Sequence, residues 1–138
     1  MAAKIIDGKV VSEHILGLLK PRVEALASRG IIPGLAAVLI GEDPASATYV
    51  GSKTRACQKL GLYSEVIARP ASTTQSELLQ IVEDLNRNPK IHGILVQSPL
   101  PSHLDELAVT VAIDPKKDVD GFHPFNVGML LLGKPTLI

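Results

Sequence analysis

The feature that most constrains the fold is an unbroken apolar run over residues 35–40, Leu-Ala-Ala-Val-Leu-Ile, bounded by Pro33-Gly34 and Gly41. A strand without polar side chains needs cover on both of its faces, which is typical of parallel sheets. Two further extended segments follow at residues 63–69 and 93–97, and segments with helical spacing lie between them. Strands that alternate with helices predict an α/β fold with three layers, a mostly parallel sheet with helices on both faces.

Capping signals place the predicted helices between these strands. A helical pattern covers residues 9–29, where Pro21 predicts a kink or two abutting helices and Gly30 predicts the end. Asp43-Pro44 fits an N-cap followed by proline at the first helical position, and this helix is expected to run towards Leu60-Gly61. The later signals are a capping box at Thr74-Gln-Ser-Glu77, a short helix after Ser102-His-Leu-Asp105, a charged loop over residues 114–121 and an apolar segment over residues 127–132.

Composition excludes several classes of protein. The chain has 138 residues, enough for one domain, and its 14 basic and 14 acidic residues give a formal net charge of zero. With only two Tyr and two Phe, this balance disfavours binding of nucleic acid or an anionic membrane. The single cysteine, Cys57, excludes an internal disulfide and suits the cytoplasm. The four histidines lack metal-ligand spacing, so we expect no metal.

The candidate catalytic residues are Tyr49, Lys53 and Gln97. Tyr49 and Lys53 are four residues apart and share one face of the helix that follows the first strand. Gln97 ends the third strand, so we expect it to emerge at the same carboxyl edge of the sheet. A lysine against a partly apolar floor loses its proton more readily, which suits it to proton transfer. The alternative is a surface lysine whose stem covers a tyrosine ring.

The charged loop leaves a second choice open. Asp118 and Asp120 are ordinary residues for a solvated turn, but Val119 and Gly121-Phe122 flank Asp120 with apolar or small residues. One of the carboxylates can therefore be held against a ligand. Cys57 lies one helical turn beyond Lys53 and is either an activated thiol or, as we favour, a small buried apolar residue.

Three segments resemble one known family. They are Asp-Pro-Ala-Ser-Ala-Thr-Tyr-Val-Gly-Ser-Lys at 43–53, Gly-Ile-Leu-Val-Gln-Ser-Pro-Leu-Pro at 93–101 and Pro-Lys-Lys-Asp-Val-Asp-Gly-Phe at 115–122. Together they are similar to the bifunctional methylenetetrahydrofolate dehydrogenase/cyclohydrolase family (FolD type), and their order and spacing match along the whole chain. Ser98 departs from that family, which often has leucine at this position.

The resemblance implies a role for each candidate residue. Lys53 would transfer protons, Gln97 would position it, and Tyr49 would stack on the aminobenzoyl part of a folate. Asp120 would grip the pterin through a bidentate, charge-assisted pair. The substrate-binding residues implied in this way are Tyr49, Lys53, Val96, Gln97, Ser98, Pro99 and Asp120.

The resemblance also implies a larger protein. It predicts a homodimeric enzyme of one-carbon metabolism, with a tetrahydrofolate substrate and NADP bound by a Rossmann-like second domain. No G-x-G-x-x-G fingerprint occurs here, and the sequence stops on Leu137-Ile138, so we expect residues 1–138 to be the folate-binding catalytic domain as a fragment. The alternatives are a non-catalytic folate-binding fragment and a short-chain dehydrogenase. A short-chain dehydrogenase needs a glycine-rich turn after its first strand, and Gly41-Glu-Asp-Pro does not supply one.

Overall fold

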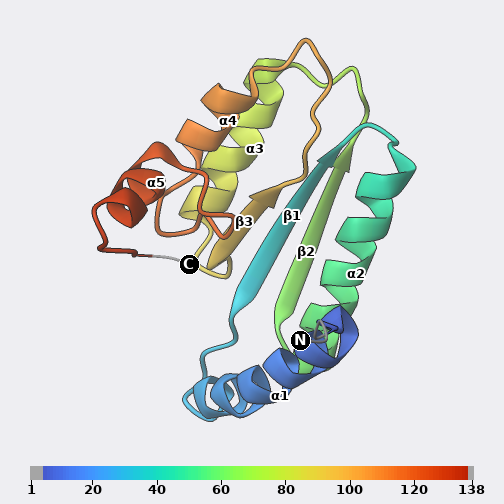
Figure 1. The fold of residues 1–138 in the computed structure, drawn as a ribbon. Coiled ribbons are helices and arrows are strands. Elements are labelled where there is room, and N and C mark those ends of the chain that lie inside the picture. The colour runs from blue at the N-terminus through green and yellow to red at the C-terminus, as the bar shows by residue number, and fades with distance from the viewer. Residues whose placement is uncertain (1–4, 137–138) are drawn as a thin grey trace.

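The computed structural model describes residues 5–136, so the expectation drawn from Leu137-Ile138 lies outside the described residues. Strands and helices alternate along the chain as the sequence predicts (Figure 1). The elements are α1 (Gly8–Ala27), β1 (Gly34–Ile40), α2 (Pro44–Leu60), β2 (Tyr63–Arg69), α3 (Gln75–Arg87), β3 (Gly93–Val96), α4 (Glu106–Ala112) and α5 (Pro124–Leu131).

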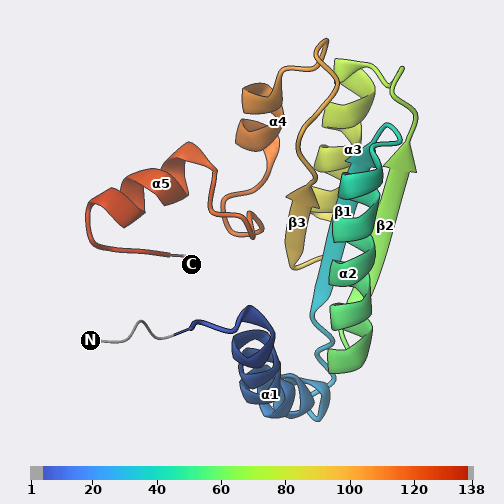
Figure 2. The ribbon, with the colours of Figure 1, turned by 45° about the vertical axis from the view of Figure 1, so that its right-hand side comes forward.

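The strands form one parallel sheet in the order β2-β1-β3. The chain passes from β1 through α2 to β2 and then returns through α3 to β3 on the other side of β1. Helix α2 covers one face of the sheet, and α3 with α4 covers the opposite face (Figure 2). This arrangement confirms the expected three-layer α/β fold, with the change of winding direction between β1 and β3.

The two faces of the sheet are covered unequally. On one face, side chains of β1 and β3 pack with α3 and α4 in the larger part of the core, which includes Val38, Ile94, Leu78, Val82 and Val109. On the other face, the buried cluster among residues 5–136 consists of Ala37, Val50 and Leu95. Helix α2 packs mainly against β1 and β2, so part of the face of β3 lies outside its cover.

Local capping explains why the helices begin and end where the sequence predicts. The Asp43 carboxylate accepts a hydrogen bond from the Ser46 backbone N–H at 2.7 Å, and Gly61 ends α2 in the left-handed conformation with φ of 78°. Thr74 and Glu77 form the predicted capping box of α3. Helix α4 begins after Asp105, whose side chain caps it.

Helix α1 corrects one expectation. It runs without interruption over Gly8–Ala27 with Pro21 inside it, so the alternative of two abutting helices is wrong. Proline removes the hydrogen bond to the carbonyl of Gly17, but both residues are exposed and water can bind that carbonyl instead. The apolar segment predicted over residues 127–132 forms most of α5.

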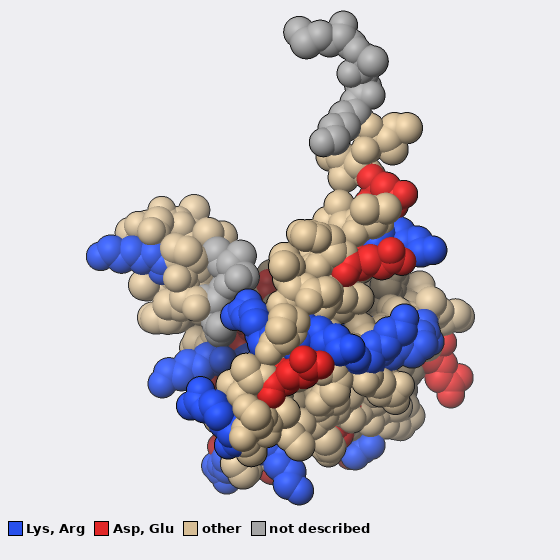
Figure 3. All heavy atoms as spheres, turned by 90° about the horizontal axis from the view of Figure 1, so that it is seen from below, with Lys and Arg blue, Asp and Glu red and all other residues tan. Residues whose placement is uncertain are grey.

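Helices α1 and α5 project from the sheet on the same side (Figure 2). Between them the space-filling surface is hollowed, and acidic side chains lie among the basic ones on this face (Figure 3). None of the helices within residues 5–136 combines the length and the apolar character that crossing a bilayer requires.

Candidate active site

The structure brings Lys53 and Gln97 together across the uncovered face of β3. Lys53 lies in the third turn of α2 and is partly buried, and Gln97 immediately follows β3. The Lys53 Nζ donates a hydrogen bond to Gln97 Oε1 at 3.3 Å. This contact joins residues 44 positions apart, so only the tertiary fold creates it.

A pocket of about 470 Å³ opens beside this pair. Its walls combine a lysine and a carboxylate with apolar side chains of β1 and β3, and the lining includes Lys53, Asp120, Val119, Leu35, Leu95 and His92. This volume falls in the range of small-molecule sites, which usually join an apolar lining to a few convergent polar groups. The pocket therefore has the size and chemistry to hold a flat, polar-edged ligand against Lys53.

The pocket lies along the face of β3 and not only at the carboxyl edge of the sheet. Gln97 is at that edge, as expected, but it is not among the described residues that line the pocket, whereas Gly34 and Gly93 at the amino ends of their strands do line it. The physical reason is the position of Lys53 on α2. At 1.5 Å per residue, Lys53 lies roughly 14 Å along the helix, which runs back toward the amino ends of the strands.

The loop over residues 114–121 places Asp120, and Lys117 anchors its beginning. The Lys117 ammonium donates to the backbone carbonyls of Leu85, Asn86 and Asn88 at 3.1, 2.6 and 3.1 Å. These carbonyls lie at the C-terminal end of α3, where a cation is favoured by the helix dipole and by unpaired acceptors. The loop is thus fastened to the helix that packs on the opposite face of the sheet.

Asp118 organises the centre of the same loop and is only 2% exposed. Its carboxylate accepts hydrogen bonds from Gly121 N, His123 N and Asn126 Nδ2 at 3.1, 2.8 and 2.9 Å. Burial by itself raises the pKa of Asp118, but these hydrogen bonds outweigh it and hold the pKa below its ordinary value. Asp118 is therefore a structural carboxylate within the loop.

Val119 packs against Gly93 of β3 and so brings the loop close to the sheet. The Ile94 backbone N–H donates to Lys117 O at 2.7 Å, which pairs this part of the loop with the free side of β3. A Cβ atom on Gly93 would lie 2.5 Å from Val119 Cγ1, so only glycine permits this close approach. The next residue, Asp120, then faces the pocket opposite Lys53.

Asp120 is the loop carboxylate that remains available to a ligand. It keeps contact with solvent, but partial burial raises the pKa of its carboxyl. The Lys53 ammonium opposes this rise and the Asp118 carboxylate adds to it. A carboxylate at the rim of a pocket that has no hydrogen-bond partner among the described residues is suited to accepting hydrogen bonds from a ligand.

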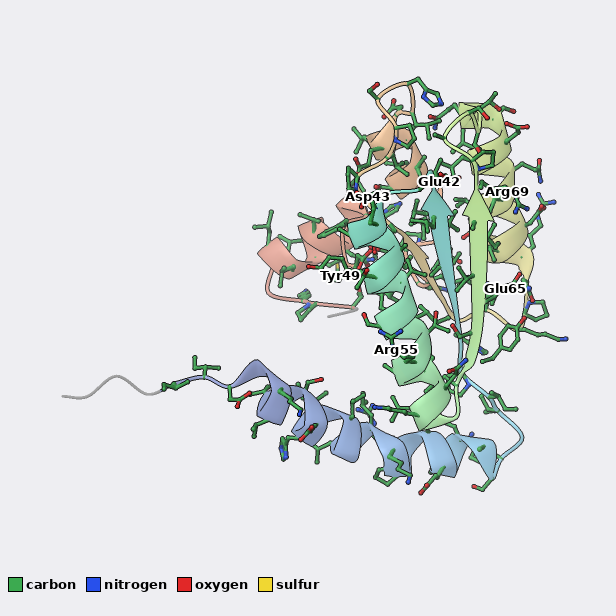
Figure 4. The ribbon with its side chains drawn as sticks, turned by 90° about the vertical axis from the view of Figure 1, so that its right-hand side faces the viewer. Glu42, Asp43, Tyr49, Arg55, Glu65 and Arg69 are labelled. Carbon is green, nitrogen blue, oxygen red and sulfur yellow. The ribbon has the colours of Figure 1, made fainter. Side chains whose placement is uncertain are left out.

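The other expected site residues are placed less uniformly. Val96 and Ser98 line a second pocket of about 30 Å³ together with Asp120, which has room for one water molecule. Tyr49 is 62% exposed and projects from α2 on the side of α5 (Figure 4). Neither Tyr49 nor Pro99 lines either of these pockets among the described residues.

Sequence reasoning missed the residues that hold the loop. Lys117 and Asn126 were not singled out as anchors, and the interpretation of residues 114–121 as a solvated turn is wrong for Lys117 and Asp118. The hydrogen-bond partners of Lys117 and Asn126 lie 8 to 32 residues away, so no local pattern could reveal these anchors. Cys57 is buried, and burial raises the pKa of its thiol, as the interpretation of a packed apolar residue predicts.

A larger pocket, of about 710 Å³, lies at the amino ends of the strands. Its lining includes Ile31, Ile32, Tyr63, Lys90 and His92 but no carboxylate. Size alone favours this pocket, but it lacks the opposed lysine and acid found beside β3. We therefore take the smaller pocket, with Lys53, Gln97 and Asp120, as the candidate active site.

Comparison with protein families gives a match over most of the chain. Residues 6–120 match the family model described as tetrahydrofolate dehydrogenase/cyclohydrolase, catalytic domain. The bifunctional protein FolD 2 of Geobacter sulfurreducens is 58% identical over 134 residues, which are 97% of this chain and 47% of that protein. The bifunctional protein FolD of Moorella thermoacetica is 55% identical over 96% of this chain and 48% of its own length.

Solved structures give the same result. The bifunctional FolD enzyme of Campylobacter jejuni is 44% identical with a TM-score of 0.96, over 99% of this chain and 49% of that one. The Trypanosoma brucei methylenetetrahydrofolate dehydrogenase-cyclohydrolase, complexed with NADP cofactor and inhibitor, is 36% identical with a TM-score of 0.95. That match covers 100% of this chain and 48% of the other. The chain thus spans about half the length of the relatives that it matches.

Proposed function

Because the chain belongs to the tetrahydrofolate dehydrogenase/cyclohydrolase family, we propose that it forms the folate-binding catalytic half of a bifunctional enzyme. The whole protein would interconvert 5,10-methylene- and 5,10-methenyl-tetrahydrofolate with NADP and hydrolyse the methenyl form to 10-formyl-tetrahydrofolate. The observation that carries this proposal is the Lys53–Gln97 contact beside a pocket whose opposite wall holds Asp120.

The residues of this chain can serve the hydrolytic step. Water adds to the bridging carbon of the cationic methenyl group, and the neutral amine of Lys53, formed when the ammonium has given a proton to solvent, takes the proton that this water releases. The bond between the bridging carbon and N5 then breaks, N5 receives a proton from Lys53, and the hydroxyl proton leaves as the formyl group forms. The overall step consumes one water and releases one proton. Gln97 Oε1 holds Lys53 Nζ toward the pocket during these transfers.

Asp120 and Tyr49 would bind different parts of the substrate. A pterin presents a ring N–H beside its amino group, and the free carboxylate of Asp120 can accept both hydrogen bonds. Tyr49 lies one helical turn before Lys53, and its exposed ring offers a stacking surface for the aminobenzoyl group. A single folate would thus extend from the pocket along α2.

The helices that follow β1 and β2 do not fit the diphosphate of a dinucleotide. Such a group needs a helix N-terminus with free backbone N–H groups. At α2 the Asp43 carboxylate already occupies this position, and the hydrogen bonds with Ser46 lower its pKa (Figure 4). At α3 Glu77 does the same. We therefore propose that NADP binds in the part of the relatives' length that this chain does not span.

Further features of the whole protein belong to this proposal. We propose a homodimer that acts in the cytoplasm in one-carbon metabolism, without a metal, nucleic acid or membrane partner. The zero net charge supports the absence of a nucleic-acid or anionic-membrane partner, and the single buried cysteine supports the cytoplasmic location. A folate-binding half without catalysis is the alternative to test, whereas the family match leaves no basis for a short-chain dehydrogenase.

Replacing Lys53 tests the proposed function. In a chain extended with the second half that the relatives possess, Lys53→Met should lower the rate of methenyl-tetrahydrofolate hydrolysis by roughly 10²–10⁴-fold, because a positioned acid-base group is lost. The matched control is Lys59→Met in the last turn of the same helix. The loss of methenyl absorbance gives the rate. A Lys53→Met variant that keeps more than about a tenth of the rate would return Lys53 to the role of a surface lysine.

A further inference from the structure

Gln97 is held by a series of contacts that continues beyond the pocket. Its Nε2 donates to the backbone carbonyl of Ser98 at 2.8 Å, while its Oε1 accepts from Lys53. The Ser98 hydroxyl in turn donates to Glu106 Oε1. We infer that Glu106, acting through Ser98, is a positioning residue that fixes the side-chain orientation of Gln97. This inference rests on the proposed function of Gln97 and Lys53.

The orientation of the Gln97 amide decides whether it can hold Lys53. An amide has an accepting oxygen at one end and a donating nitrogen at the other. With Nε2 bonded to Ser98 O, Oε1 is directed to the Lys53 ammonium; a reversed amide would set two donors against each other. The position of the Ser98 carbonyl therefore selects the useful orientation.

That carbonyl needs an anchor, because the strand has already ended. The last bond of the sheet on this segment is from the Gln97 backbone N–H to Val38 O at 2.9 Å. Beyond it Ser98 and Pro99 are both exposed. The bond from the Ser98 hydroxyl to Glu106 then ties the segment to the first residue of α4.

Helix α4 is a firm support for this bond. Val109 of α4 is only 1% exposed and packs in the core with α3. The Asp105 side chain caps the first turn of α4. Glu106 also lines the small pocket shared by Ser98 and Asp120. The series of contacts Glu106–Ser98–Gln97–Lys53 thus connects the start of α4, behind the sheet, to the candidate catalytic lysine in front of it.

The side-chain amide protons of Gln97 report this positioning directly. In the ¹⁵N-labelled chain, we expect Ser98→Ala and Glu106→Ala to accelerate their exchange with solvent by about threefold to tenfold, because one supporting hydrogen bond is lost. Ser98→Thr and Glu106→Gln retain a hydroxyl donor and a carbonyl acceptor and should restore slow exchange. Ser102→Ala is the control, since the structure shows no side-chain hydrogen bond for this exposed serine within residues 5–136.

Each outcome of this experiment decides the inference. Unchanged exchange in both alanine variants would overturn it, and a Glu106→Gln variant that behaves like Glu106→Ala would assign the effect to charge. In the extended chain, both alanine variants should lower kcat for methenyl hydrolysis by a similar factor, with rescue by Ser98→Thr, and Glu106→Ala, which removes no substrate-binding residue, should leave KM unchanged. Absence of hydrolysis by the unmutated extended chain would contradict the proposed function, while the exchange measurement would still test the positioning.

Discussion

At the scale of single residues, the two aspartates of the loop have opposite electrostatic environments. Three hydrogen-bond donors satisfy Asp118 and lower its pKa, whereas burial without a paired donor raises the pKa of Asp120. Their pKa directions separate a carboxylate that the fold uses from one that remains free for a ligand. The sequence alone could not distinguish these two residues, which lie immediately before and after Val119.

We predict that Asp120→Asn weakens tetrahydrofolate binding by roughly 10- to 150-fold, since a hydrogen bond to a charged acceptor is lost and an amide donor faces the pterin donors. Because Asp120 is exposed and the structure shows no hydrogen bond for its side chain within residues 5–136, the free energy of unfolding at pH 7 should stay within about 0.5 kcal/mol of that of the unmutated chain. Calorimetric titration and thermal melting of one variant measure both quantities. Unchanged folate affinity with a lowered melting temperature would make Asp120 a structural residue.

At the scale of elements, three tertiary interactions fix the position of the loop over residues 114–121. Lys117 fastens it to the end of α3, a parallel bridge pairs it with β3, and Asp118 closes it on Asn126. These three anchors lie on different parts of the fold. The loop can therefore present Asp120 to the pocket without rearranging when a ligand binds.

We predict that Asp118→Asn destabilises the chain by about 2–3 kcal/mol at pH 7, because an amide cannot accept all of the charge-assisted hydrogen bonds. The folded-state pKa of Asp118 is lowered, so its contribution is present above the unfolded-state pKa of about 3.9 and is lost as the pH falls toward the folded-state pKa. The difference in unfolding free energy between the two chains should therefore shrink from pH 7 to pH 3.

Urea unfolding at both pH values measures that difference. Asp84→Asn on the exposed face of α3 is the control and should change it little. Other carboxyls with lowered pKa, Asp43 and Glu77, are present in every variant and cancel. A destabilisation of equal size at pH 7 and pH 3 would show that shape, and not the charge of Asp118, supports the loop.

Some features of the helices and loops could be predicted from the sequence and others could not. The limits of α2 and the capping box of α3 were predicted because Asp43, Gly61 and Thr74 act on residues within one turn of themselves. The prediction of two abutting helices at Pro21 was wrong because α1 is exposed there, and water can bind the carbonyl that proline leaves without a hydrogen bond. The anchors of Lys117 and the contact from Ser98 to Glu106 depend on tertiary neighbours, so no periodicity could indicate them.

At the scale of the whole molecule, the site follows from unequal cover of the sheet. Helix α2 packs mainly on β1 and β2, and the loop over residues 114–121 reaches the far side of β3, which leaves a pocket between them. The approach of Gln97 to Lys53 follows from parallel topology and could be expected. The extent of the pocket along β3 could not, because it depends on where the third turn of α2 lies.

The most direct test is titration of the ¹⁵N-labelled chain of 138 residues with tetrahydrofolate and, separately, with NADP. We predict saturable, one-to-one binding of tetrahydrofolate, with chemical-shift changes centred on the Gln97 side chain and on the amides of Gly93 and Asp120. NADP should bind negligibly, because Asp43 and Glu77 occupy the helix N-termini that a diphosphate needs. Absence of folate binding, folate-induced shifts centred on Ile31, Ile32 and Tyr63 of the larger pocket, or tight stoichiometric binding of NADP would contradict the account.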